Sequence, residues 1–209
     1  MIQAVIFDIG GVFSRFENRP NLQTWAQDCK LEPDALSEMI FGPAAEDAYT
    51  GRTPEQQHWQ NIGQKLGLNL EQSNQLRLEI YGDFVWDIEL LEYARTLRPQ
   101  YKTAVISSAF SNVRTEIAGW VNETMFDTLV YSAEVGLNKP DATIYLCALG
   151  RLEVPAEQSI FIDDRPENVE GARAVGMIGL LFSSSEQVRR DLDALIRPTE
   201  VANGVFFVL

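Results

Sequence analysis

Short apolar runs separate longer amphipathic segments along this chain. Runs of four to six apolar residues occur at 4–7, 103–106, 159–162 and 177–182, with a weaker run at 128–131. Such runs are typical of strands buried on both faces of a sheet. Helix-like segments lie between the later runs, at 110–121, 142–152 and 168–175. This alternation predicts an α/β fold: a doubly wound, mainly parallel, Rossmann-like sheet.

Residues 14–86 interrupt this alternation, because they contain several helix signals and no convincing strand run. Pro20 and Pro33 can each begin a helix. The segment 53–56, Thr-Pro-Glu-Gln, predicts a capped helix start with a capping-box glutamine, and residues 70–81 predict another helix. The chain would then return to the core through a helix at 88–97. We therefore predict a core of residues 1–13 plus 87–209 and a helical cap of residues 14–86, whose aromatic residues would form its own small core.

Length and charge limit what the molecule can be. The chain has 209 residues, 45% hydrophobic and 22% charged, which suits one folded core carrying an insert. Thirty acidic and seventeen basic residues give a net charge of −13. This charge repels nucleic acids and anionic lipid surfaces, so we expect neither as a partner. The sequence does not determine the oligomeric state.

The ends and the cysteines point to a cytoplasmic protein. A strand begins at once and Asp8 interrupts its apolar run, unlike a signal peptide. No stretch approaches the ~18 apolar residues of a membrane span. Cys29 and Cys147 lie far apart in the sequence, so we expect free thiols. The apolar last residues, 204–209, are expected to pack somewhere on the fold.

Polar residues that follow the apolar runs are the candidates for chemistry, because ligands of parallel sheets bind beyond the carboxyl ends of the strands. They are Asp8, Ser107, Ser108, Lys139, Asp163 and Asp164. Each has a structural alternative: a turn-forming aspartate, serines or acids that cap helices, and a surface lysine. Their joint occurrence at strand ends of one sheet favours a shared site.

These residue types suit phosphoryl transfer. A carboxylate such as Asp8 can accept a phosphoryl group as an aspartyl-phosphate. Two anions must first be brought together, and the hard oxygen ligands of Asp163 and Asp164 suit Mg²⁺, which would spread the charge. Lys139 adds a cation, and Ser107 can donate a hydrogen bond to a phosphoryl oxygen.

Four segments together resemble the haloacid dehalogenase superfamily. They read F-D-I-G-G-V from residue 7, V-I-S-S from 105, N-K-P from 138 and F-I-D-D-R-P-E-N from 161. The helical insert is similar to the cap that one branch carries after its first strand. Within that branch the pattern resembles bacterial glucose-1-phosphatases and the phosphatase domain of soluble epoxide hydrolases.

The resemblance implies a role for each matching residue. Asp8 would be the nucleophile, Ser107 and Lys139 would act on the phosphate with Ser108 nearby, and Asn168 would support the metal ligands. The Mg²⁺ ligands would be Asp8, Asp163, Asp164 and the backbone carbonyl of Gly10. The implied activity is Mg²⁺-dependent hydrolysis of a small phosphorylated metabolite, such as a sugar phosphate.

Gly10 departs from the family pattern, which places an aspartate there to protonate the leaving group. General acid catalysis is worth about 10²–10⁴ in rate, so we expect activated phosphates to react better than alkyl ones. Glu17, Glu46, Asp47 and His58 are candidate substitute acids, although a packing role suffices for His58.

Three rival functions stay open. A dehalogenase would also use Asp8, but displacement of halide by a carboxylate requires no metal and leaves the paired acids without a purpose. A signalling receiver domain has similar residues in another order, with its acidic pair first. A non-catalytic protein that binds a phosphorylated ligand or a protein partner is compatible with Gly10.

Overall fold

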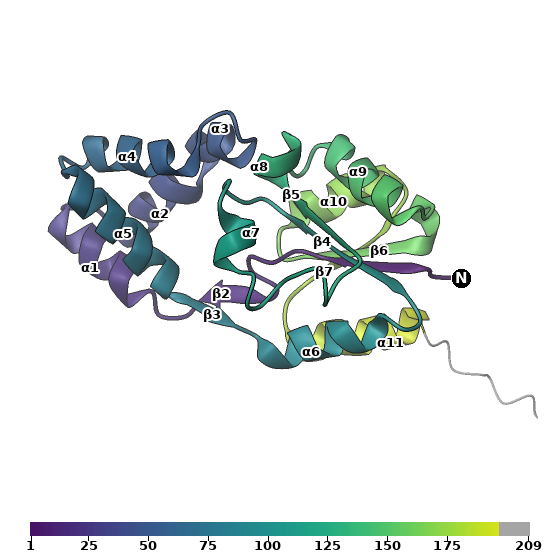
Figure 1. Cartoon of the computed structure of the whole chain (residues 1–209). Coiled ribbons are helices and arrows are strands. Elements are labelled where there is room, and N and C mark those ends of the chain that lie inside the picture. Colours follow the sequence, from purple (N-terminus) through teal and green to yellow (C-terminus); the bar gives the residue numbers. More distant parts are fainter. Residues whose placement is uncertain (197–209) are drawn as a thin grey trace, which may run out of the picture.

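The computed structural model describes residues 1–196, which contain a five-stranded parallel sheet. The strand order is β5-β4-β1-β6-β7 (Figure 1). The bounds are β1 Ala4–Phe7, β4 Lys102–Ser107, β5 Thr128–Tyr131, β6 Ser159–Asp163 and β7 Ile178–Leu181. The predicted α/β class and parallel sheet are confirmed.

Strand β1 lies at the centre of the sheet. Its last residue, Phe7, is in register with Val105 of β4 and Ile162 of β6. Because all three strands are parallel, their carboxyl ends meet at one edge. The residues that follow these strands are thereby brought together.

Helices cover both faces of the sheet (Figure 1). On one face, α6 (Ile88–Leu97) and α11 (Ser185–Ile196) pack against Val5 and Phe7. On the other, α9 (Ala142–Leu152) and α10 (Pro166–Ala174) pack against Ala4 and Ile6. Neighbouring residues of β1 thus point to opposite faces, and both sets are buried, which explains its uninterrupted apolar run.

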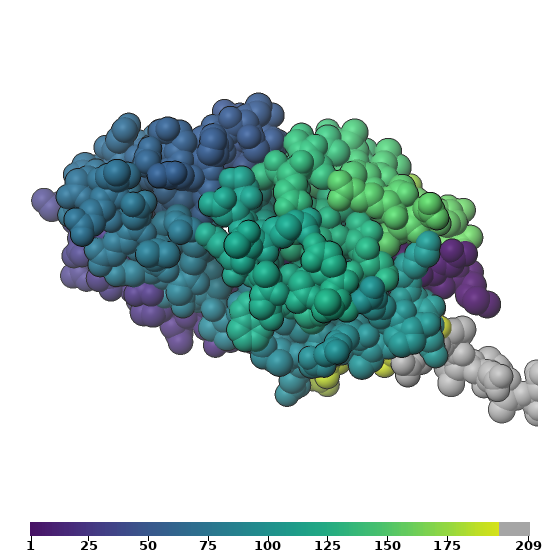
Figure 2. All heavy atoms as spheres, in the orientation of Figure 1, coloured from purple at the N-terminus to yellow at the C-terminus, as the bar shows by residue number. Residues whose placement is uncertain are grey.

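The inserted segment forms five α-helices beside the sheet (Figure 1), and Figure 2 shows it, in blue, packed against the green core. The helices are α1 Pro20–Asp28, α2 Pro33–Phe41, α3 Glu46–Tyr49, α4 Glu55–Lys65 and α5 Leu70–Gly82, with a 3-10 turn at Pro43–Ala45. They share a buried cluster that includes Leu22, Leu36, Trp59, Ile62 and Leu76. The division into core and cap remains a prediction.

The expectation that residues 14–86 hold no strand is wrong. Strand β2 (Ser14–Phe16) pairs antiparallel with β3 (Phe84–Trp86) where the chain enters and leaves the helical segment. Each strand has three residues, too few for a periodic pattern, and about seventy residues of sequence separate the partners. Tertiary pairing creates this ribbon.

Most predicted helices agree with the structure, and two helix signals do not. The helices at 88–97 and 142–152 have the predicted bounds. The helix predicted at 110–121 is only α7, Val113–Glu116. The capping box predicted at 53–56 is absent at the start of α4, whereas Asn69 and Gln72 form one at the start of α5.

The remaining elements are short. They are α8, Ser132–Val135, and a 3-10 turn at Ala156–Gln158. Both cysteines are free thiols, as expected. Within residues 1–196, no helix is long and apolar enough to cross a membrane. The expectation for residues 204–209 lies outside the described residues.

Candidate active site

The carboxyl edge of the sheet gathers the residues predicted from the strand ends. Asp8 directly follows β1, and its backbone N–H donates to the carbonyl of Ile162 at 2.9 Å. Ser107 ends β4 and Asp163 ends β6. Asp8 and Ser107 are each 5% exposed and Asp163 is fully buried. We call Asp8, Ser107, Lys139, Asp163 and Asp164 the catalytic edge.

A buried lysine joins the two strand-end carboxylates. Lys139 Nζ lies 2.7 Å from Asp8 Oδ1 and 2.7 Å from Asp163 Oδ2. The lysine side chain is 1% exposed, so solvent screens neither contact. Removal of one partner from such a cluster would leave a buried charge uncompensated. A surface role for Lys139 is therefore ruled out.

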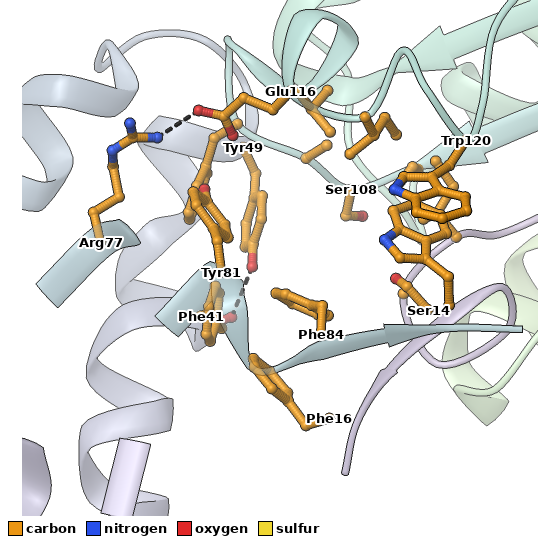
Figure 3. Close-up of a pocket in the computed structure, with 18 of the residues that line it drawn as sticks. Ser14, Phe16, Phe41, Tyr49, Arg77, Tyr81, Phe84, Ser108, Glu116 and Trp120 are labelled. Carbon is orange, nitrogen blue, oxygen red and sulfur yellow. Dashed lines mark hydrogen bonds and ion pairs between the residues drawn. The ribbon is translucent and has the colours of Figure 1, made fainter. Parts of the chain in front are cut away.

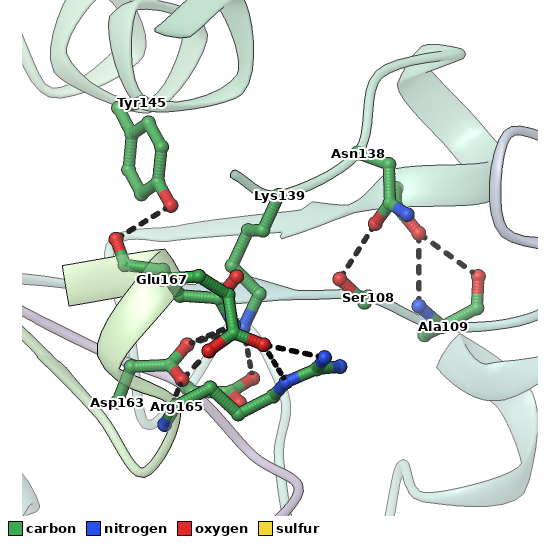
Figure 4. Close-up of polar contacts among 11 residues, drawn as sticks. Ser108, Ala109, Asn138, Lys139, Tyr145, Asp163, Arg165 and Glu167 are labelled. Carbon is green, nitrogen blue, oxygen red and sulfur yellow. Dashed lines mark hydrogen bonds and ion pairs between the residues drawn. The ribbon is translucent and has the colours of Figure 1, made fainter. Parts of the chain in front are cut away.

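Hydrogen bonds from the start of α10 hold the carboxylate of Asp163 (Figure 4). Asn168 Nδ2 donates to both oxygens at 3.0 Å, and the backbone N–H of Arg165 donates to Oδ1 at 2.9 Å. Tyr145 in turn donates from its hydroxyl to the Asn168 carbonyl at 2.8 Å. With these bonds and Lys139, Asp163 is fixed and can orient the lysine.

Burial is the main influence on the pKa values of the central pair. Burial raises the pKa of Asp8 to about 7, the Lys139 ammonium opposes this rise, and Asp163 adds to it. For Lys139, burial alone would lower the pKa, but Asp8 and Asp163 outweigh it and the pKa lies above its ordinary value. A cation bound beside Asp8 would favour its ionised form and lower its pKa.

Three carboxylates at this edge could hold a metal ion. Asp8, Asp163 and Asp164 each offer an oxygen, and these oxygens all lie within 4.8 Å of one another. Asp163 already accepts several hydrogen bonds. The carboxylate oxygens of Asp8 and of the exposed Asp164 are therefore more available as metal ligands. Oxygen donors of this kind fit Mg²⁺.

The loop after β1 approaches Asp164 so closely that only glycine fits. Gly11 has φ +83°, and a Cβ there would lie 2.1 Å from Asp164 Oδ2. Gly10 differs, because a Cβ there would meet no heavy atom within 4 Å beyond its chain neighbours. A side chain could therefore begin at position 10, where the family pattern places an aspartate.

The two serines after β4 have different surroundings. Ser107 borders open space beside Gly10, whereas Ser108 donates from Oγ to Asn138 Oδ1 at 2.6 Å (Figure 4). Asn138 Nδ2 then donates to Glu46 Oε2 at 2.8 Å. This chain links the core to the inserted helices, and sequence reasoning gave Asn138 no role although it lies in the N-K-P segment.

The four candidate substitute acids lie in different places. Glu17 pairs with Arg15, and Asp47 pairs with Arg52 at exposed positions. His58 is 6% exposed, its ring Nε2 lies 2.9 Å from the Ile40 carbonyl, and burial lowers its pKa. This geometry supports a packing role for His58. Glu46 alone of the four is hydrogen-bonded, through Asn138, to Ser108, which directly follows Ser107 of the catalytic edge.

A cavity of about 560 Å³ extends from the catalytic edge between the core and the inserted helices (Figure 3). Its wall includes Gly10, Ser107 and Ser108 at one end and many aromatic side chains beyond them: Phe16, Phe41, Tyr49, Tyr81, Phe84, Trp86, Phe110 and Trp120. We call it the aromatic cavity. Sequence reasoning assigned the aromatic residues of the insert to a small core. Trp59 is buried there, but Tyr49 and Tyr81 line the cavity.

Comparisons with known proteins agree with this arrangement. The chain is 27% identical over 201 residues to a sesquiterpene phosphatase of Aspergillus oryzae, covering 93% of this chain and 96% of that protein. It is 32% identical over 93 residues to a phosphorylated carbohydrates phosphatase of Thermotoga maritima, covering 42% of this chain and 43% of that protein. Stretches of it also match parts of longer curated proteins.

Solved structures share the fold. A haloacid dehalogenase family enzyme of Bacteroides thetaiotaomicron, in complex with magnesium and inorganic phosphate, superposes with a TM-score of 0.74 at 16% identity, over 88% of this chain and 95% of that one. The family model of haloacid dehalogenase-like hydrolases matches residues 23–181. The predicted motifs also lie together at one edge of the sheet. The chain therefore belongs to the family of haloacid dehalogenase-like hydrolases and is a hydrolase enzyme.

Proposed function

We propose that this protein is a Mg²⁺-dependent phosphatase that hydrolyses a phosphate monoester through an aspartyl-phosphate on Asp8. The observation that carries the proposal is the buried contact of Lys139 with both Asp8 and Asp163, with Asp164 beside them. The relatives named as phosphatases support the same class of reaction. The phosphatase activity, the metal requirement and the site roles predicted above are all parts of this proposal.

The proposed reaction has two displacements. An Asp8 oxygen attacks phosphorus, the bond from phosphorus to the ester oxygen breaks, and the alcohol departs with a proton taken from water, which becomes hydroxide. A second water then attacks phosphorus, the bond to Asp8 breaks, inorganic phosphate leaves, and the proton released from the attacking water neutralises the hydroxide. The net reaction consumes one water and yields one alcohol and one phosphate. Lys139 stabilises the ionised nucleophile, and Ser107 donates to the phosphoryl group.

Asp8, Asp164 and the Gly10 carbonyl would hold the Mg²⁺, with Asp163 beside them. Bound there, Mg²⁺ would supply the positive charge that two approaching anions require. The distances among the three carboxylates allow such a site.

Trapping the intermediate tests the proposal. Acetyl phosphate is a suitable probe, since it is small and its acetate needs no leaving-group proton. We expect Mg²⁺-dependent phosphate release that a chelator abolishes, and a quenched sample in which mass spectrometry finds a phosphoryl group on Asp8. If no phosphate is released from any ester, or if the phosphoryl group lies on another residue, the proposed mechanism is wrong.

Gly10 favours one alternative, a non-catalytic protein that binds phosphorylated ligands. In that case phosphate would bind with Mg²⁺ and no ester would turn over. A haloacid dehalogenase would instead release chloride from 2-chloropropionate without added metal. The acidic pair Asp163 and Asp164 suits a metal that the dehalogenase would not need, so it favours the phosphatase over the dehalogenase.

A further inference from the structure

We infer that the aromatic cavity binds the alcohol part of the substrate, and that this part is an apolar hydrocarbon group. The inference rests on the proposed phosphatase function and names its class of substrate. A phosphate at the catalytic edge would place its ester oxygen at the end of the cavity bordered by Gly10, Ser107 and Ser108. The rest of the molecule must then extend along the cavity or into solvent.

The size of the cavity suits an organic group of moderate length. Its volume of about 560 Å³ lies within the range of about 300–1,000 Å³ that is usual for small-molecule sites. The wall comes from both sides of the molecule, with Tyr49 and Tyr81 on the inserted helices and Phe110 and Trp120 on the core. A ligand in this space is enclosed on both sides.

Stacked rings make the wall nearly continuous. Phe16 and Phe84, brought together by the β2–β3 pairing, stack with centroids 4.1 Å apart. Tyr49 and Phe110 stack at 4.8 Å across the two sides. Such surfaces gain free energy when an apolar group displaces water from them.

Several polar groups of the wall already have partners within the protein. The hydroxyl of Tyr81 donates to Glu55 Oε1 at 2.8 Å, and that of Tyr49 donates to the Phe41 carbonyl at 3.2 Å. Arg77 and Glu116 form an ion pair with each other (Figure 3). Among the bonds described, the hydroxyls of Ser14, Ser37 and Ser107 and the indole N–H groups of Trp86 and Trp120 have no partner, and Ser107 lies at the end assigned to the phosphate. A sugar would lose its hydrogen bonds to water here and recover few of them.

Gly10, two residues after Asp8, lies at the end of the cavity that is nearest the catalytic edge. Because nothing lies within 4 Å of a Cβ built there, the position of the usual acid is open space that continues into the cavity. Glycine at position 10 therefore has two consequences: the usual proton donor is absent, and space is left for a bulky substrate group beside the ester oxygen.

A matched pair of esters tests the inference. n-Octyl phosphate and glucose 6-phosphate both release a primary alcohol, so they need leaving-group protonation to a similar degree and differ mainly in the group that the cavity receives. We expect kcat/KM to favour octyl phosphate by at least about tenfold, the scale set by a few methylenes in an apolar pocket. Acetyl phosphate, which does not reach along the cavity, reports the phosphatase reaction itself.

Binding gives a readout that does not depend on turnover. Octylphosphonate and methylphosphonate carry carbon in place of the ester oxygen and cannot be hydrolysed as esters. By calorimetry with Mg²⁺, we expect octylphosphonate to bind at least about tenfold more tightly, with a negative heat-capacity change that marks apolar burial.

Two exposed leucines provide matched variants. Leu78 of α5 lines the cavity and is 62% exposed, whereas Leu146 of α9 is 53% exposed and lies outside it. Leu78→Gln should lower the ratio of octyl to acetyl kcat/KM by about threefold or more, given the value of a methylene in such a pocket. Leu146→Gln should leave this ratio unchanged.

The outcomes separate the two proposals. Turnover of acetyl phosphate with equal or better use of glucose 6-phosphate would overturn the substrate class and leave the phosphatase standing. If none of the phosphate compounds is hydrolysed, the phosphatase proposal is wrong. The phosphonate affinities would then be the remaining test of whether the cavity binds a hydrocarbon group. Equal binding of the two phosphonates would show that the cavity does not receive the hydrocarbon chain.

Discussion

At the catalytic edge, Asp8 and Asp163 are ionisable, almost fully buried, and each bound to the buried ammonium of Lys139. In the adjoining aromatic cavity, Tyr81 and Phe84 present rings to the open space, and several polar groups of the wall, such as the Tyr81 hydroxyl, are bonded to protein partners. In the proposed reaction the first region would hold the phosphoryl group through charge, and the second would receive the hydrocarbon part. On this proposal, reaction type and substrate preference are set by different residues, so that each can be changed separately.

The largest expected effect is the loss of the nucleophile at the catalytic edge. Asp8→Asn should lower turnover of acetyl phosphate by several orders of magnitude, as removal of a nucleophile does elsewhere. The preference for octylphosphonate over methylphosphonate should stay within a few fold, because the cavity that would receive the chain is unchanged. Asp28→Asn removes the same charge from an exposed position in α1 and should retain full activity. Substantial Mg²⁺-dependent turnover by Asp8→Asn would contradict the assigned role of Asp8.

The second prediction concerns Gly10, which lies between the two regions: it follows Asp8 by two residues and lines the aromatic cavity. At Gly10 a Cβ meets nothing within 4 Å, so Gly10→Asp is sterically reasonable and should raise kcat for octyl phosphate by up to about 10²–10⁴, the value of general acid catalysis. The rate for acetyl phosphate should change little, because acetate leaves without a proton.

Gly10→Asn is the control for the acid, since it has the same shape and cannot donate in the same way. A matching gain in the asparagine variant would show that size, and not proton donation, limits the enzyme. No gain in either variant would mean that another group already protonates the alcohol.

Removal of the buried cation should damage stability as well as rate. Lys139→Met leaves Asp8 and Asp163 facing each other without a positive charge, which should lower the free energy of unfolding by about 3–5 kcal/mol. Urea denaturation measures this loss, and added Mg²⁺ should recover part of it by ligand linkage. Lys65→Met, at an exposed position in α4, should change stability little. Unchanged stability of Lys139→Met would show that the ion pairs are not needed to hold the edge.

The smallest expected effect concerns a buried group of the inserted helices that is kept neutral. Burial lowers the pKa of His58 below its ordinary 6.5. Below pH 6.5 the unfolded chain therefore binds a proton that the folded chain resists, so stability should fall as pH drops from this value, by at most about 1.4 kcal/mol per pH unit. Denaturant titrations at pH 7.5 and 5.5 measure the change.

His58→Gln keeps a donor for the Ile40 carbonyl and removes the titration. Between pH 7.5 and 5.5, the free energy of unfolding of the wild type should therefore fall by more than that of His58→Gln. A difference that is the same at both values would show that His58 is protonated without cost in the folded protein.

Much of the catalytic edge was predictable, because each of its residues follows an apolar run. Parallel strands bring their carboxyl ends together, so the sequence positions of Asp8, Ser107 and Asp163 were enough to predict their proximity. The prediction for Lys139 also relied on the family resemblance, because the sequence around a lysine before proline does not show where its side chain points. Its burial between two carboxylates is a property of the folded sheet.

Periodicity and burial also explain which elements were predicted well. Helices α6 and α9 each lie against the sheet through one apolar face and end where that pattern ends. The segment at 110–121 has a similar composition, but only Val113–Glu116 is helical. In this stretch Phe110 packs with the inserted helices and Trp120 stacks on Trp86, so tertiary contacts override local preference.

The sequence by itself determined the α/β class, the helical insert and the residues that meet at the carboxyl edge, because local periodicity and strand direction carry that information. Only the tertiary structure decided the β2–β3 ribbon, the neutral packing of His58 and the aromatic cavity. Each of these depends on side chains that come together from distant segments. Whether an aromatic residue supports a core or lines a binding site depends on which neighbours leave space beside it, and no pattern along one chain segment specifies that space.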